Sequence, residues 1–322
     1  MKRKSLTVVI LVIVVVIITV IVVDFLNNRP DRRGSNPYAL EVENFKDVDP
    51  ELISHKEKRN LSLGSLKGSA LVYAEGKLYV AGDSSLVAML PDGSGLEQFT
   101  IESHPVSLLV ETQWIYVAYK TKVLQYDRDM KLVRRWEDLG ERAVITNMAG
   151  KGENIYVADA GNRRVLIYST EGELKGEFEG KAESDAGHGF IVPSANFDLL
   201  VNRFGELWIV NPGKHALENY SDDGRMRGFW ENASFDIDGF LGCCNPARIT
   251  ALNDGSFVTS EKGLVRIKIY DQSGKLKSVV ASPNMFKEEG KAPDICTDEN
   301  GVVYALDFDR NAIRIFEPEI DE

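Results

Sequence analysis

Short apolar segments alternate with polar turns along most of this chain. Between Leu78 and Phe316 one unit recurs six times, consisting of an apolar strand, a polar turn, a second apolar strand and a turn rich in Asp and Gly. The centres of the first strands are Tyr79, Tyr116, Tyr156, Trp208, Phe257 and Tyr304. Their separations, 37 to 52 residues, are those of a four-stranded antiparallel blade. The pattern predicts an all-β, six-bladed β-propeller, with seven blades as the less favoured count.

The ends of the repeat region predict how the ring closes. The last unit runs out near Pro318, after its third strand, and so lacks an outer strand. The segment around Lys58 to Gly64 precedes the first blade and can supply that strand, which would remove an exposed sheet edge. No amphipathic helical segment of roughly 10–15 residues separates the strands, which argues against a doubly wound α/β fold.

The N-terminus follows a different pattern. Three basic residues occupy positions 2–4, and the segment from Leu6 to Val23 is apolar except for two threonines. As a helix, this segment spans about 27 Å, close to the hydrocarbon thickness of a bilayer. Its length, and the lack of a small-residue cleavage pattern after it, favour an uncleaved signal-anchor over a cleaved secretory signal. The basic end predicts a cytoplasmic N-terminus and an extracytoplasmic body, periplasmic or extracellular.

These patterns divide the chain into four parts. We expect a basic tip and transmembrane signal-anchor at 1–26, a juxtamembrane linker at 27–43, a propeller at 44–318 and an acidic tail at 319–322. The net charge is −11 in total and +2 for residues 1–43, which leaves −13 on the remainder. So acidic a body is unsuited to binding nucleic acid, and residues 6–23 are the expected contact with the membrane.

One family resemblance is visible in these repeats. The stretch IYVADAGNRRVLIYSTEGEL, which starts at Ile155, resembles an NHL-type repeat. Residues 190–286 resemble a group of bacterial NHL-repeat propellers of unassigned function, through a Gly-Cys-Cys-Asn-Pro loop at 242–246 and a Thr-Ser-Glu-Lys-Gly turn at 259–263. The resemblance covers roughly residues 45–318 and implies a propeller fold. It implies little about activity, because NHL propellers include lyases, ligand binders and protein-binding platforms. The first two units lack the Asp-x-Gly-Asn-Arg turn.

The topology of a propeller predicts which residues share a face. Because each strand reverses direction, the loop that enters a blade and the turn between its second and third strands lie on one face. We expect this loop face to bind a small-molecule ligand or a partner protein. Its candidate residues, from blades four and five, are His188, Asn211, His215, Cys243, Cys244, Asn245, Glu261, Lys262 and Arg266. The alternative is that polar residues there only build turns, and we prefer it for Asp159, Gly161 and Asn162.

The adjacent cysteines Cys243 and Cys244 are the least ordinary feature of that face. They could stiffen the loop, form a strained and easily reduced vicinal disulfide, or bind a soft metal ion with His188 as a third ligand. We prefer the structural interpretation. No CxxC or HxxxH spacing is present, so we predict no cofactor and leave a metal ion as a possibility. Cys296 is expected to be a buried small hydrophobe.

The leading functional hypothesis is a membrane-anchored, extracytoplasmic NHL-type propeller that acts as a binding module through its loop face. The alternative is a redox or metal-dependent enzyme that uses Cys243, Cys244 and Glu261 near the central channel. Glu261 and Lys262 could form an acid/base pair or an anion clamp with Arg266, or a solvated surface pair. No Walker loop, dinucleotide fingerprint or Gly-x-Ser-x-Gly elbow appears, and the scattered histidines do not reproduce those of NHL lyases. We therefore expect a binding module rather than an enzyme.

Overall fold

The computed structural model describes residues 2–27, 45–181 and 189–319. The chain divides into two units, Met1–Glu41 and Val42–Glu322. His188, residues 28–43 of the predicted linker and residues 320–322 of the tail lie outside the described residues.

The first unit contains helix α1 (Lys2–Asn27), which carries the apolar N-terminal segment. Side-chain exposure along α1 is described for residues 11–24, and all of them are exposed. Within the described residues, no helix has both the length and the hydropathy needed to cross a membrane. The transmembrane anchor stays a prediction from the sequence.

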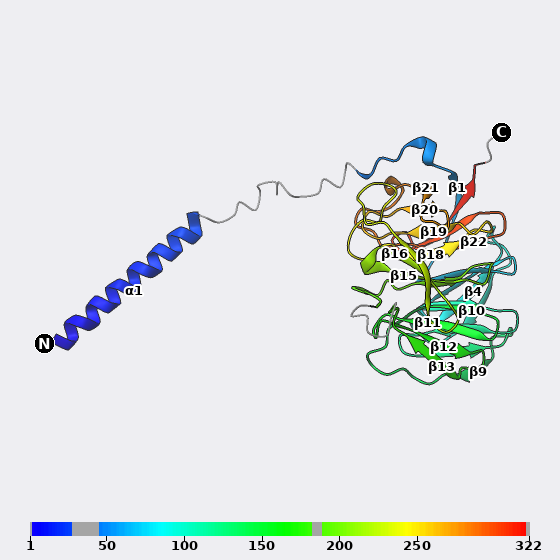
Figure 1. Cartoon of the computed structure of the whole chain (residues 1–322), viewed down its shortest axis with the longest axis horizontal. Coiled ribbons are helices and arrows are strands. Elements are labelled where there is room, and N and C mark those ends of the chain that lie inside the picture. The colour runs from blue at the N-terminus through cyan, green and yellow to red at the C-terminus, as the bar shows by residue number, and fades with distance from the viewer. Residues whose placement is uncertain (1, 28–44, 182–188, 320–322) are drawn as a thin grey trace. The chain divides into compact units, whose positions relative to one another are not determined.

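The second unit is a six-bladed β-propeller of four-stranded antiparallel sheets, as predicted (Figure 1). Blades one and two are formed by β2 (Gly68–Ala74), β3 (Lys77–Gly82), β4 (Ser85–Met89) and β5 (Glu97–Thr100), and by β6 (Ser107–Val110), β7 (Ile115–Ala118), β8 (Val123–Tyr126) and β9 (Leu132–Arg135). Blades three and four are formed by β10 (Ile145–Lys151), β11 (Asn154–Asp159), β12 (Arg164–Ser169) and β13 (Leu174–Phe178), and by β14 (Leu199–Val201), β15 (Leu207–Asn211), β16 (Ala216–Tyr220) and β17 (Met226–Glu231).

Blade five consists of β18 (Arg248–Ala251), β19 (Phe257–Ser260), β20 (Ile267–Tyr270) and β21 (Leu276–Ala281). Blade six takes β22 (Asp294–Thr297), β23 (Val303–Asp307) and β24 (Ala312–Pro318) from the end of the chain. Among the described residues, short 3₁₀ turns occur at η2 (Pro50–Leu52), which precedes the strands, and at η3 (Pro212–Lys214) and η4 (Pro283–Met285).

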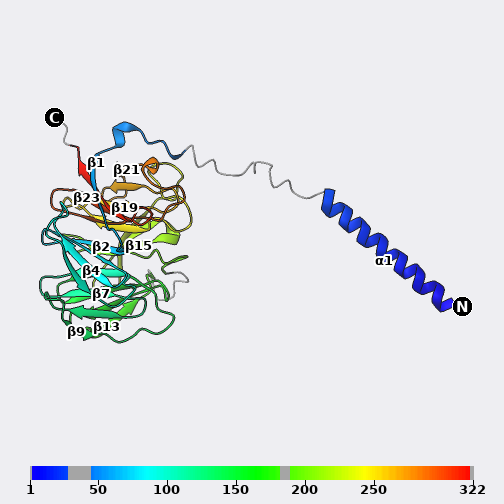
Figure 2. The same ribbon diagram turned by 180° about the vertical axis from the view of Figure 1, so that it is seen from behind.

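The outer strand of blade six comes from the other end of the propeller sequence. Strand β1 (His55–Ser62) pairs antiparallel with β24, so the sheet order is β1-β24-β23-β22. In both views the blue β1 lies beside the red C-terminal strand (Figures 1 and 2). The predicted closing strand is confirmed, and it begins at His55 rather than Lys58. This pairing removes the free edge that a three-stranded last blade would leave.

The repeated aromatic centres are buried between neighbouring blades, which explains why the sequence repeats them. Tyr116 and Tyr156 have no exposed surface. The Tyr116 hydroxyl donates to the backbone oxygen of Thr170 at 3.1 Å, and the Tyr156 hydroxyl contacts Asp222 at 3.4 Å. In each case the partner lies in the next blade. An aromatic ring fills the space between two sheets while its hydroxyl satisfies a group at the turn of the neighbour.

Candidate functional site

Polar residues at the end of the second strand of a blade hold the loop that enters that blade. The Asp159 carboxylate accepts the backbone N–H of Val144 at 3.0 Å, and the Asn211 side-chain oxygen accepts that of Ile191 at 2.9 Å. Both side chains have no exposed surface. Both side chains therefore hold the loop backbone in place, which agrees with our preferred interpretation of Asp159. Asn211 was a candidate for ligand binding, but its buried side chain supports the loop and does not face a ligand.

In blade five, Glu261 holds the entry loop as part of a buried ion cluster. Its carboxylate lies 2.7 Å from Arg266 Nη2 and 2.9 Å from Lys268 Nζ, and all three side chains are at most 1% exposed. Burial would raise the pKa of Glu261, but the two cations outweigh that effect and the pKa is lowered. Burial lowers the pKa of Lys268 to about 8. Glu261 therefore pairs with Arg266 and Lys268 in the interior rather than with Lys262 in solvent.

The two cations of this cluster also bind the entry loop itself. Lys268 Nζ donates to the backbone oxygens of Ile237 and Gly239 at 3.0 and 2.7 Å, and Arg266 Nη2 donates to Gly239 O at 3.0 Å. The Glu261 carboxylate accepts the N–H of Leu241 at 3.3 Å. Every charge in the cluster has a partner, which is the condition under which buried ions are tolerated. The cluster thus fixes the segment that leads into the cysteines.

Residues 241–247, which we call the cysteine loop, are closed by the side chain of Asn245. Its Nδ2 donates to Leu241 O at 2.6 Å and to Lys262 O at 3.1 Å, and its Oδ1 accepts the N–H of Lys262 at 2.9 Å. Gly242 has φ +84°, a left-handed conformation that suits glycine. On the far side, His215 Nδ1 lies 2.9 Å from Asn245 O. The structure thus brings His215, Asn245 and Lys262 together, as the face argument predicted.

The cysteines are unpaired thiols whose sulfurs touch. Cys243 is exposed and Cys244 is buried, with their Sγ atoms 3.1 Å apart. Hydrogen bonding to Cys244 raises the pKa of Cys243. Burial would raise the pKa of Cys244, but the Ser194 and Cys243 side chains and the Lys262 charge outweigh it and lower the pKa. Ser194 Oγ is itself buried without a hydrogen bond of normal geometry. The pair is thus asymmetric in both exposure and acidity.

A second group of residues, polar in five blades and alanine in blade one, occupies one equivalent position on the six innermost strands. The pairing of inner and second strands aligns Ser107 with Ala118, Asn147 with Ala158, Arg248 with Ser260 and Asp294 with Leu306. Asp198 occupies the same position in blade four, because its carbonyl accepts the N–H of Val210 at 2.8 Å. We call this set the channel ring, and its members from blade one onward are Ala70, Ser107, Asn147, Asp198, Arg248 and Asp294.

Four of the five polar members of the channel ring form a hydrogen bond with the following blade. Ser107 Oγ donates to the side-chain oxygen of Asn147 at 2.9 Å, and Asn147 Nδ2 donates to the Asp198 carboxylate. Asp198 accepts the backbone N–H of Ile249 at 2.8 Å. Asp294 likewise accepts the N–H of Leu71 in blade one at 2.7 Å. The ring therefore links the inner strands of neighbouring blades with side-chain hydrogen bonds.

Arg248 differs from the other members because its hydrogen-bonding groups are little used. Its Nη1 lies 3.4 Å from Thr146 O, and its Nε lies 3.7 Å from the Asp294 carboxylate. The second distance is too long for a direct hydrogen bond. These are its contacts with polar partners within the described ranges, while a guanidinium carries five N–H donors. Its side chain is 17% exposed. Arg248 thus presents several donors that the surrounding protein does not satisfy.

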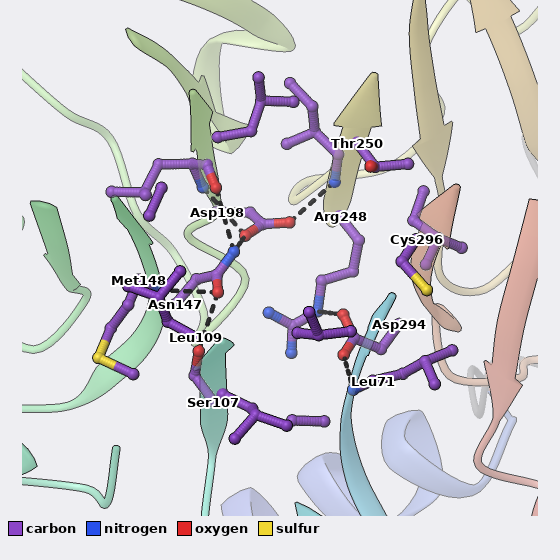
Figure 3. A pocket seen from close by; sticks show the side chains of 18 of the residues that line it. Leu71, Ser107, Leu109, Asn147, Met148, Asp198, Arg248, Thr250, Asp294 and Cys296 are labelled. Atoms are coloured by element: carbon purple, nitrogen blue, oxygen red, sulfur yellow. Dashed lines mark hydrogen bonds and ion pairs between the residues drawn. The ribbon is translucent and has the colours of Figure 1, made fainter. Parts of the chain in front are cut away.

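The ring encloses a cavity of about 320 Å³, lined by all six inner strands. In Figure 3, Arg248 and Asp294 face Asn147 and Asp198 from the opposite side of this cavity. Burial raises the pKa of Asp198 to about 6 and also raises the pKa of Asp294. The ring lies at the beginning of the inner strands, where the entry loops arrive, and Arg248 directly follows the cysteine loop. The ring end of the cavity and the cysteine loop therefore belong to the same face.

No cluster of three or more His, Cys, Asp or Glu side chains suited to a metal ion occurs in the part of the chain that the structure describes. The predicted third ligand, His188, lies outside that part. Cys296 lines the central cavity and is buried, which confirms the predicted position. None of the three described histidines, His55, His104 and His215, lines that cavity.

The sequence prediction missed the channel ring and Lys268. A signal for the ring exists, since its members precede the fourth residue of the repeated strand motif by 11 residues in blades one to three and by 12 in blades four to six. Because the residue type at this position changes from blade to blade, only the near-constant spacing from the strand motif identifies the ring in the sequence.

Comparisons with known proteins support the propeller fold alone. No protein-family model matches the chain, and no curated protein matches it. A streptogramin B lyase structure matches with a TM-score of 0.57 and 13% identity, covering 82% of this chain and 87% of that one. A catalytically inactive virginiamycin B lyase from Staphylococcus aureus with quinupristin matches with a TM-score of 0.57 and 12% identity, over 83% and 100%. A protein of unknown function from Bacteroides thetaiotaomicron matches with a TM-score of 0.55 and 16% identity, over 82% and 73%.

Proposed function

We propose that this chain is a membrane-anchored, extracytoplasmic binding module that takes a small carboxylate-bearing ligand at the mouth of its central channel. The observation that carries the proposal is Arg248, a cation with unsatisfied donors in a cavity of about 320 Å³. Small-molecule sites are concave and hold a few convergent polar groups. We favour a small molecule over a protein partner because these groups converge inside the cavity rather than on an exposed surface.

A carboxylate is the ligand group that suits Arg248. A planar guanidinium can donate two parallel N–H bonds to one carboxylate, which gives both energy and orientation. The acidic ring members are occupied elsewhere, since Asp198 accepts Ile249 N–H and Asp294 accepts Leu71 N–H. Asp198 and Asp294 therefore serve to position the inner strands, and Arg248 is the group left to meet a ligand.

The repeat and the N-terminal segment support the other parts of this proposal. The turn from Asp159 to Arg164 has the NHL-type sequence, and Asp159 bonds both Asn162 and Arg164 within it. The anchor rests on the sequence alone: residues 6–23 form an apolar run of the length expected for a signal-anchor, and the basic residues before them favour a propeller outside the cytoplasm. In this arrangement the propeller samples ligands in the periplasmic or extracellular space.

The binding part is tested by thermal unfolding of the full chain in detergent with acetate, the smallest stable probe of carboxylate binding. A ligand that binds the folded state raises Tm in a concentration-dependent manner. We expect sodium acetate, compared with sodium chloride at equal ionic strength, to raise the Tm of the wild type and of Arg203→Gln, an exposed-arginine control. Arg248→Gln should show no acetate effect, and neutral acetamide should have none on any protein. An equal acetate effect in Arg248→Gln, or no effect in the wild type, would contradict the proposal.

The anchoring part is tested separately, by cell fractionation. The full chain should stay in the membrane fraction after alkaline extraction, and externally added protease should reach the propeller in spheroplasts. A variant without residues 1–26 should become soluble while its propeller stays folded. Release of the full chain by alkaline extraction would refute the anchor without touching the acetate result.

A further inference from the structure

The cysteine loop holds its two sulfurs in an arrangement that the binding proposal does not use. Cys243 is exposed, Cys244 is buried behind it, and 3.1 Å separates their Sγ atoms. The Asn245 side chain closes the loop around them by bonding Leu241 O and Lys262 O. We propose that Cys243 and Cys244 form a thiol–disulfide exchange site that reduces a disulfide substrate and becomes a vicinal disulfide itself.

The chemistry starts at the exposed thiol. Cys243 Sγ attacks one sulfur of the substrate R–S–S–R and forms a mixed disulfide, while R–S⁻ leaves with the electron pair of the broken bond and takes up a proton. The Ser194 and Cys243 side chains and the Lys262 charge lower the pKa of Cys244, which favours its thiolate. In this ionised form the Cys244 sulfur, 3.1 Å away, takes the proton of Cys243 as Cys243 attacks. Cys244 thus acts first as the base for its neighbour.

The second half of the reaction uses the buried thiol. Cys244 loses its proton to solvent and attacks the Cys243 sulfur, so that the second R–S⁻ leaves and is protonated. The two cysteines lose two electrons, which the substrate disulfide receives as it becomes two thiols. Because Cys244 is buried behind Cys243, it meets a substrate only after Cys243 has reacted. The site therefore has an attacking and a resolving cysteine in fixed order.

Oxidation of the pair would act on the loop face directly. The next residue, Asn245, bonds His215 and Lys262 through its own backbone and side chain, and Arg248 follows three residues later. A vicinal disulfide imposes its own turn on these two residues. The exchange reaction thus reshapes the rim beside the channel ring.

The test uses the reduced full chain and the aromatic disulfide DTNB, whose coloured thiol product is counted. Wild type should release two thiol equivalents per chain under native conditions, pass through a mixed adduct, and end without adduct at a mass lower by two hydrogens. Cys296, buried and with a pKa raised well above normal by burial, should stay unreacted. Cys296→Ser should therefore behave like the wild type and serves as the matched control.

Two variants separate the roles of the pair. Cys244→Ser should release one equivalent and keep the adduct, and Cys243→Ser should react at least about ten-fold more slowly, because its remaining thiol is buried. If either variant fails to fold, the wild-type time course still tests the order of the two steps, because the mixed adduct must form first and then disappear. A stable adduct on the wild type, no reaction of the native wild type while denatured protein shows three thiols, or undiminished reactivity of Cys243→Ser would each overturn the proposal.

Discussion

The carboxylate of Asp198 in blade four accepts the backbone N–H of Ile249 in blade five at 2.8 Å. The same carboxylate accepts the N–H of Leu199 at 2.9 Å and a bond from the Asn147 amide. Removing it in Asp198→Ala leaves two buried N–H groups without partners, each worth about 1–3 kcal/mol. We expect the free energy of unfolding, measured with urea, to fall by about 2–6 kcal/mol in total. Asp129→Ala, at an exposed turn, should change it by less than about 0.5 kcal/mol.

The buried cluster of Glu261, Arg266 and Lys268 predicts a local effect as well as a global one. Lys268→Met removes the ammonium that compensates Glu261 and holds two loop carbonyls, and we expect a loss of about 3–5 kcal/mol in stability. Hydrogen exchange of residues 236–247 should speed up more than that of blades one and two. Lys277→Met, which breaks an exposed ion pair with Asp254, is the control and should cost less than about 1 kcal/mol. Uniform exchange across all blades would contradict the role assigned to Lys268.

The closing strand predicts the cooperativity of the domain. Deleting residues 55–62 removes β1 and leaves β24 as an open edge in a three-stranded blade. We expect the propeller to lose its cooperative thermal transition and to aggregate, because the exposed edge can pair with other chains. Circular dichroism and light scattering measure both effects. A deleted protein that stays monomeric and unfolds in one sharp transition would show that closure by β1 is dispensable.

The channel carboxyls predict how ligand affinity depends on pH. Burial raises the pKa of Asp198 to about 6 and also raises those of Asp294 and Glu111, all of which line the cavity. Above these pKa values the groups are negative and repel an anion, and below them they are neutral. The affinity for acetate should therefore rise as the pH falls from 8 to 6. Titration calorimetry measures this change, and Asp198→Asn should bind acetate more tightly at pH 8 and with a weaker pH dependence.

The fold was predictable because the same physical need recurs in every blade. Tyr116 and Tyr156 each fill the gap to the next sheet and bond its turn, so the sequence repeats an aromatic residue at that place. The closing strand was predictable from the missing fourth strand after Pro318. Its true start, His55, was not, because polar residues of an outer strand carry little hydrophobic pattern.

The site was harder to predict because neighbours in sequence are not neighbours across a hairpin. Glu261 and Lys262 are adjacent in the chain, yet β19 and β20 pair so that Thr259 faces Lys268, which brings Lys268 rather than Lys262 to the Glu261 carboxylate. Arg248 follows the cysteine loop directly and went unnoticed, because its equivalents in the other blades are Ala, Ser, Asn and Asp. The strand register shows that these residues share a position, which the sequence indicates only through their spacing from the repeated strand motif.

The most direct test of the binding account is the nuclear magnetic resonance signal of the Arg248 side chain. In full-length protein labelled with ¹⁵N-arginine, the Nε–H signal of Arg248 is identified by its absence in Arg248→Lys. The account predicts that this signal shifts saturably on titration with sodium acetate, while acetamide and sodium chloride leave it in place. An Arg248 signal that acetate does not move, or that chloride moves equally, would contradict carboxylate binding at the channel mouth.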